Sequence, residues 1–143
     1  TAAILTSFGF RVRQNPHNDK DVEIREEFKW RQMAEELNPN KQPDFLINRK
    51  IFDHLMPSGR DAVHVARSIL LKTDGRQTRR VTVDLINNEA FQMGYFSLRD
   101  LHYALSKKDN ETLWEVIVIH GTMEAPRVSS VWPHIVEHSP IAP

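Results

Sequence analysis

Runs of apolar residues predict three strands. Across residues 80–86 every second position is apolar, which is typical of a strand with one buried face. Residues 112–120 are the most apolar of the three stretches and indicate a strand near the centre of a sheet. Residues 2–13 are rich in β-branched and aromatic side chains, so we expect an N-terminal strand there.

Helical spacing of apolar residues predicts a first helix over residues 21–37. Acidic side chains occupy its first turn, where the helix dipole favours them. Positions spaced i, i+3, i+4 and i+7 form one apolar face, namely Trp30, Met33, Ala34 and Leu37. Ile24 and Phe28 lie on a different face, which suggests that neighbouring elements cover this helix on two sides.

A second helix is expected over residues 43–55, where apolar side chains again follow helical spacing and Pro57 stops the helix. Residues 61–71 are compatible with two structures. They have an apolar stripe at helical spacing, and they also suit the first arm of a hairpin that turns at Asp74-Gly75. The helix is the favoured interpretation.

Ser97 and Asp100 have the spacing of a capping box and predict the start of a short helix. From residue 125 onward, repeated prolines favour an extended tail. The predicted fold class is therefore α+β: an N-terminal strand and two or three helices, then a strand–helix–strand half around a small sheet, then the extended, proline-containing C-terminal tail. We expect one domain over residues 1–143, with residues 125–143 as a docked or swapped tail.

The charge balance limits how this chain can bind nucleic acid. It has 19 basic and 19 acidic residues and no formal net charge when histidine is neutral. Because binding to duplexes depends on neutralising phosphates, a balanced chain is not expected to be a general clamp for nucleic acid, although a local basic patch remains compatible. The absence of cysteine excludes disulfides, thiolate nucleophiles and cysteine-bound zinc within this chain.

The sequence shows no apolar run approaching the roughly 20 residues that span a bilayer and no signal peptide. We therefore expect a soluble, cytoplasmic or otherwise intracellular protein with no membrane partner.

One candidate metal motif lies near the C-terminus. His134, Glu137 and His138 match the H-x-x-E-H pattern of inverted zinc proteases, in which two histidines on one helix face bind zinc. Pro133 and Pro140 leave barely two helical turns, and few residues remain to supply a third ligand. We therefore predict no zinc site.

His120 and Thr122 form the second candidate motif. Together with the apolar residue before them they resemble the hydrophobic-H-x-T signature of the two-histidine phosphoesterases. The resemblance implies acid–base catalysis by His120 and phosphate binding by the Thr122 hydroxyl. That family needs a second copy of the motif on a facing strand, and no other histidine here repeats it. A strand that ends in a turn at Gly121 is the simpler interpretation.

Pro43-Asp44 together with Glu27-Phe28-Lys29 resembles the PD…(D/E)xK set of metal-dependent nucleases. The resemblance implies that the paired acids bind magnesium and that the lysine orients the attacking water. The order departs from the family pattern, because here the E-x-K triplet precedes the PD pair and lies on a predicted helix. A capping aspartate and a solvated helix face are therefore the expected roles.

A basic turn surrounds Asp74-Gly75 and holds the densest group of cations in the chain: Lys72, Arg76, Arg79 and Arg80. Arginine side chains match phosphate in a bidentate manner, so these residues are candidates for binding phosphate or an acidic partner. A solvated turn that keeps a sheet edge soluble is the alternative.

The predicted tail is apolar for a free terminus, and Trp132 is its candidate contact residue. The favoured function is non-catalytic macromolecular binding or assembly, through a protein partner or through self-association of the tail, with no cofactor. Two alternatives stay open. One is a small phosphodiesterase or nuclease that uses His120 and Thr122, and the other is a nucleic-acid-binding module that acts through the basic turn.

Overall fold

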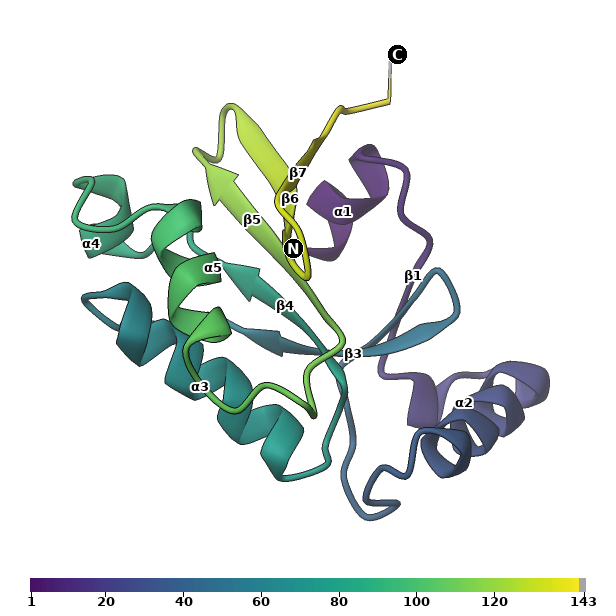
Figure 1. Ribbon diagram of the computed structural model, residues 1–143. Coiled ribbons are helices and arrows are strands. Elements are labelled where there is room, and N and C mark those ends of the chain that lie inside the picture. Colours follow the sequence, from purple (N-terminus) through teal and green to yellow (C-terminus); the bar gives the residue numbers. More distant parts are fainter. Residues whose placement is uncertain (142–143) are drawn as a thin grey trace.

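A seven-stranded mixed sheet forms the centre of the computed structural model, which describes residues 1–141 (Figure 1). The strands lie side by side in chain order, and β3, β4 and β5 are parallel while all other neighbours are antiparallel. The α+β class is confirmed. The strands are β1 (Val12–Gln14), β2 (Phe45–Ile47), β3 (Lys50–Leu55), β4 (Arg80–Asp84), β5 (Glu115–Gly121), β6 (Pro126–Trp132) and β7 (Val136–His138).

Helices lie on both faces of this sheet. Figure 1 shows α3 and α5 together on one side and α1 on the other, while α2 lies beside β2 and β3. No helix in residues 1–141 is both long and apolar enough to cross a membrane. The helices are α1 (Ala2–Ser7), the 3-10 helix η1 (Pro16–Asn18), α2 (Val22–Ala34), α3 (Ala62–Asp74), α4 (Glu89–Gln92) and α5 (Leu98–Ser106).

Alternation along β5 divides the interior into two main layers. Val116 and Val118 pack with the residues of α3 and α5, whereas Ile117 and Ile119 pack with Leu5 of α1 on the opposite face. All five side chains are buried. A strand whose two faces are both covered reads as a continuous apolar run, which explains why residues 112–120 were the strongest strand signal in the sequence.

Several predicted elements are confirmed. The helix predicted over residues 21–37 is α2, and Asp21 caps it by accepting a hydrogen bond from the backbone N–H of Glu23. Residues 61–71 belong to α3, as favoured, so the alternative hairpin is wrong. Both hydrogen bonds of the capping box that joins Ser97 and Asp100 are present at the start of α5.

The helix predicted over residues 43–55 is wrong, because this stretch is the hairpin of β2 and β3. Asn48 and Arg49 form its two-residue turn with φ values of +49° and +66°. A turn with two positive φ values matches the twist of the flanking strands, and its usual sequence is Asn-Gly or Asp-Gly. Here arginine occupies the second position, so no signal for a hairpin was present in the sequence.

The buried face of α2 also differs from the prediction. Of the predicted apolar face, Trp30, Met33 and Ala34 are exposed, and Leu37, which follows the helix, is buried. Phe28, from the other face, packs with Leu37 against β2 and β3. The sequence therefore revealed the helix correctly but oriented it by its larger side chains. Two faces with similar apolar content cannot be distinguished until the neighbouring element is known.

Both ends of the chain contain more regular structure than predicted. The expected N-terminal strand is present only as β1, because residues 2–7 form α1 and bury Leu5 against the sheet. The predicted tail is extended, but its residues form β6, paired with β5, and then β7. Residues 142 and 143 of that tail lie outside the described part of the chain.

Gly121, the last residue of β5, is expected to tolerate no side chain. Gly121 has a φ of +76°, and an added Cβ would lie 2.5 Å from the carbonyl oxygen of Ala125. Gly94 has a φ of +79° but open space around it, so it serves as a matched control. Left-handed backbone costs a residue with a Cβ about 1–2 kcal/mol, and the clash should cost Gly121→Ala about 1–3 kcal/mol more than Gly94→Ala. Urea unfolding of both variants measures the difference, and equal losses would contradict the clash.

Candidate functional site

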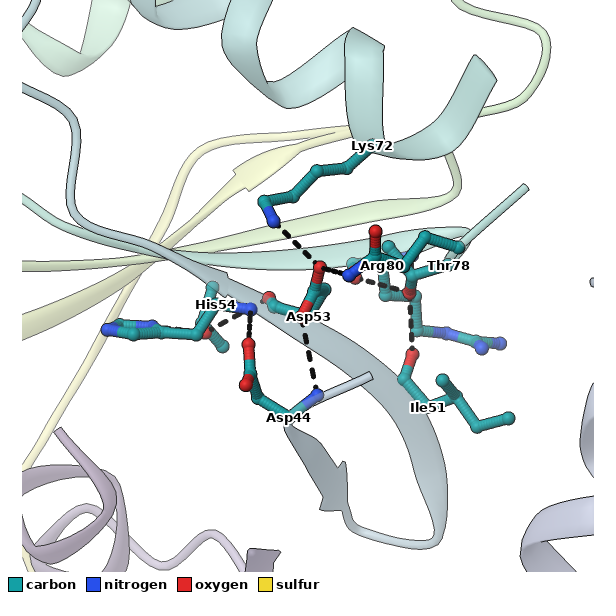
Figure 2. A network of polar contacts seen from close by, with 9 residues as sticks. Asp44, Ile51, Asp53, His54, Lys72, Thr78 and Arg80 are labelled. Carbon is teal, nitrogen blue, oxygen red and sulfur yellow. Dashed lines mark hydrogen bonds and ion pairs between the residues drawn. The ribbon is translucent and has the colours of Figure 1, made fainter. Parts of the chain in front are cut away.

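The β2–β3 hairpin brings two aspartates together. Asp44 immediately precedes β2 and Asp53 lies in β3, on the face that α3 covers (Figure 2). The backbone N–H of Asp44 donates to Asp53 Oδ1 at 3.3 Å, and the backbone N–H of His54 donates to Asp44 Oδ2 at 3.0 Å. Each carboxylate is thus held by backbone from the opposite arm of the hairpin.

Two side chains, one in the last turn of α3 and one in the α3–β4 connection, reach Asp53. Lys72, in the last turn of α3, donates from Nζ to Asp53 Oδ2 at 2.8 Å, and Gln77 Nε2 donates to the same oxygen. Figure 2 shows Lys72 approaching from the side opposite to Asp44. Asp53 is 1% exposed, whereas Asp44 and Lys72 are half-buried, so solvent and small solutes reach the edge of the group.

The surroundings of Asp53 favour its neutral, protonated form. Burial, and next the neighbouring Asp44 carboxyl, raise the pKa of Asp53 to about 6, although the Lys72 ammonium opposes this shift. Asp53 thus has one lysine partner and a second carboxyl group beside it in a largely buried place. Such an arrangement costs stability and is characteristic of sites that hold a cation or transfer a proton.

A second polar group lies on the other side of β3. His54 Nδ1 is 2.9 Å from Thr82 Oγ1, and its Nε2 is 3.3 Å from Thr1 Oγ1, which donates to Asp84 Oδ2 at 2.9 Å. Burial lowers the pKa of His54, while the charge of Asp84 opposes the shift. A neutral imidazole that links two strands and α1 is a structural role for this histidine.

The structure gives no support to a phosphoesterase site at His120 and Thr122. His120 is buried, and its Nε2 lies 2.9 Å from Ser129 Oγ. Thr122 instead accepts a hydrogen bond from the backbone N–H of Ala125 and so closes the turn after β5. Burial lowers the pKa of His120, and the positive charge of Arg127 adds to this effect.

The H-x-x-E-H residues do not lie on a helix. Glu137 and His138 belong to strand β7, so the helical geometry of the protease motif is absent from this segment. Glu137 pairs with Arg127 at 2.6 Å, and His138 Nε2 lies 2.8 Å from Ser130 Oγ. Both contacts join β7 to β6.

The four cations of the predicted basic turn point to different places. Lys72 contacts Asp53, and Arg76 lines a cavity beside α2. Arg79 donates to the backbone oxygen of Glu35, while Arg80 pairs with the Glu35 carboxylate at 2.9 Å. They do not form one free phosphate-binding cluster.

Trp132, the predicted contact residue of the tail, packs within the chain. It lies in β6, half-buried, and its ring centroid is 5.2 Å from that of His102 in α5. Its role as a partner contact stays a prediction.

Of the acids in the resemblance to the metal nucleases, Asp44 lies in the carboxylate pair and Glu27 does not. Glu27 of α2 is bound by Arg49 at 3.0 Å and by Arg31 at 3.1 Å, away from Asp44. Its place beside Asp44 is taken by Asp53, which sequence reasoning missed because β3 was predicted as helix. A Pro-Asp pair followed nine residues later by an acid on a strand was the available signal.

Comparisons with known proteins add to this geometry only at the level of fold. No family model and no curated protein matches the chain. A chain in the solved CdiA-CT/CdiI toxin and immunity complex from Burkholderia pseudomallei is similar in structure, with a TM-score of 0.61 and 24% sequence identity. The match covers 89% of this chain and 76% of that one. The similarity shows that the two chains share a fold.

The raised pKa of Asp53 predicts how stability depends on pH. Between about pH 4, the usual range for an unfolded aspartate, and pH 6 the folded chain binds more protons than the unfolded chain. Stability should therefore fall as pH rises through this window. Asp53→Asn should flatten the decline, while Glu124→Gln, at an exposed site, should leave it unchanged. Thermal unfolding between pH 4 and pH 7 measures this, and parallel curves for wild type and Asp53→Asn would contradict the assignment.

Proposed function

We propose that this chain hydrolyses phosphodiester bonds of nucleic acid with a divalent metal ion bound at Asp44 and Asp53. The observation that carries the proposal is the close pairing of these two carboxylates, with Lys72 at 2.8 Å from Asp53. The proposal departs from our sequence-based expectation of a non-catalytic chain without a cofactor. It also moves the nuclease alternative away from His120 and Thr122.

The donor set fits magnesium. This ion binds oxygen ligands and is usually held by one or two carboxylates, with water and substrate phosphate completing its coordination. Residues 1–141 contain no group of three or more acidic or histidine side chains that could enclose a metal, so an open two-carboxylate site is the arrangement available. The raised pKa of Asp53 supports a cation here, because bound positive charge would relieve the repulsion between the two acids.

Each side chain then has a chemical role. A bound magnesium ion would supply Lewis-acid stabilisation of charge on the phosphoryl group. Asp44 and Asp53 provide its oxygen ligands, and Gln77 fixes the orientation of the Asp53 carboxylate. The Lys72 ammonium lies where it can contact the phosphate or orient a water molecule for attack, as the lysine does in the metal-nuclease pattern.

A purely structural role explains the group less well. A buried acid that only supports the fold is normally matched by cations, as Glu35 is by Arg80. Asp53 has a lysine partner but also a neighbouring carboxyl group, and its raised pKa means that its ionised form costs stability at neutral pH. Retaining such a cost is typical of functional sites.

Protein binding is the second candidate function. The structural neighbour belongs to a toxin and immunity complex, so this fold occurs in a chain that is found with a protein partner. We propose that the present chain also has a protein partner, either another protein or a second copy of itself. Light scattering over a range of concentrations tests self-association, and a monomer mass throughout would leave only the unlike partner.

Substitution at the carboxylate pair tests the enzyme. Asp44→Asn, Asp53→Asn and Lys72→Met should each reduce magnesium-dependent cleavage of a fluorescent RNA or DNA oligonucleotide by at least about 100-fold, because each removes a metal ligand or a charge needed at the phosphate. Replacing magnesium with EDTA should abolish cleavage.

His120→Ala and Glu124→Gln are the controls, and both should retain cleavage. His120→Ala separates the proposed site from the one suggested by the sequence. Activity that survives Asp53→Asn in a variant with normal folding would exclude the proposed site.

A further inference from the structure

A cavity with a volume of about 900 Å³ is lined by residues that neighbour the candidate site in the sequence. Its walls come from the second half of α2, the segment after that helix, and the turn at Arg76. Two of these wall segments continue directly into the candidate site. Lys41 and Gln42 line the cavity and lead into Asp44, while Arg76 precedes Gln77, which binds Asp53. The cavity wall and the candidate site are therefore built from the same two chain segments.

The cavity has a basic rim. Lys29, Lys41 and Arg76 line it and are exposed, and Glu36 is the acidic residue among the lining side chains. Cations outnumber acids here although the whole chain is neutral. Three flexible cations around a hollow suit a phosphate-bearing ligand, because each can adjust its position to a phosphate oxygen.

The inner wall combines apolar surface with one unpaired polar atom. Phe28 and Leu37 supply buried apolar surface, and Gln32 is 5% exposed. Gln32 Nε2 donates to the backbone oxygen of Lys41 at 3.1 Å, so its orientation is fixed. His17 of η1 also lines the cavity, with its ring centroid 6.5 Å from that of Phe28. Among residues 1–141, His17 Nδ1 is a buried atom with no hydrogen-bond partner, although buried polar atoms are normally paired. Two aromatic rings and an unpaired ring nitrogen suit the flat face and the polar edge of a nucleobase.

We propose that this cavity binds one nucleotide of the nucleic-acid substrate, adjacent to the phosphodiester that is cleaved. The base lies against the inner wall with its polar edge directed to His17 Nδ1, and the phosphates contact Lys29, Lys41 and Arg76. This inference rests on the proposed nuclease function for the identity of the larger substrate. Recognition of an unstacked base implies that the substrate is single-stranded at this position or has a base flipped out of a helix.

Binding of single nucleotides to the wild-type chain is the direct test. The four nucleoside 5′-monophosphates are titrated by two-dimensional NMR, with ribose 5-phosphate and inorganic phosphate as probes without a base. At least one nucleotide should bind about tenfold more tightly than ribose 5-phosphate, and the shifted signals should include residues 36–42. Equal affinity for nucleotides and ribose 5-phosphate would overturn the proposal.

A double variant removes two cations of the rim without removing structure. Arg76 has a φ of +57°, a conformation in which glycine is unstrained, so Lys41→Gln with Arg76→Gly should not lower the melting temperature. This variant should weaken nucleotide binding about tenfold or more, since it loses two charge-assisted contacts. Arg99→Gln, which removes an exposed cation from α5, is the matched control and should bind like wild type.

Cleavage assays separate this inference from the proposed function. The double variant should raise KM for the oligonucleotide more than it lowers kcat, whereas Asp53→Asn should abolish cleavage but keep nucleotide binding. If cleavage depends on Asp53 but no nucleotide binds in the cavity, the nucleotide-site proposal is wrong and the nuclease proposal stands. If nucleotide binding depends on Lys41 and Arg76 but no cleavage occurs, the nuclease proposal is wrong and the nucleotide-site proposal stands.

Discussion

Parallel pairing of β3 with β4 is the constraint on which both the sheet and the candidate site depend. Parallel neighbours need a crossover, and here the crossover is α3, which must pass over one face of the sheet. Residues of β3 that point to that face meet the end of α3. Asp53 points there, so Lys72 in the last turn reaches it, and Gln77 in the following turn does the same. The site is therefore a consequence of the topology and not of a local sequence motif.

The same constraint means that the ionised Asp53 side chain lowers the stability of the fold. A carboxylate at the centre of a sheet loses its water, and its neighbour Asp44 adds a like charge, which is why its pKa is raised to about 6. A leucine or valine at this position would extend the apolar face that Val81, its partner in β4, already contributes. The fold thus gives up core stability at one point, where two carboxyl groups and a lysine meet. This coincidence distinguishes the group from the Glu35–Arg80 pair, where opposite charges are matched.

The sequence predicted those elements whose signals are local. The capping box at Ser97, the Asp21 cap and the continuous apolar run of β5 each lie within a few residues, and each is confirmed. The β2–β3 hairpin escaped because Arg49 occupies a turn position where glycine is expected. Because a helix was predicted over residues 43–55, Asp53 was expected to be a polar position on that helix. Lys72 was selected as a candidate for its charge, but its partner lies nineteen residues away on another element, a distance that no periodicity reveals.

Overall neutrality argues less strongly against nucleic-acid binding than the composition suggested. Many of the acids are committed within the fold: Glu27 to Arg31 and Arg49, Glu35 to Arg80, and Glu137 to Arg127. An ion pair closed within the chain contributes little to the field around it, so the unpaired groups decide what the surface attracts. Around the cavity those groups include Lys29, Lys41 and Arg76, with Glu36 as the acid in the lining. This region therefore presents positive charge to a phosphate backbone although the chain as a whole is neutral, and a cation bound at Asp44 and Asp53 would add to that charge.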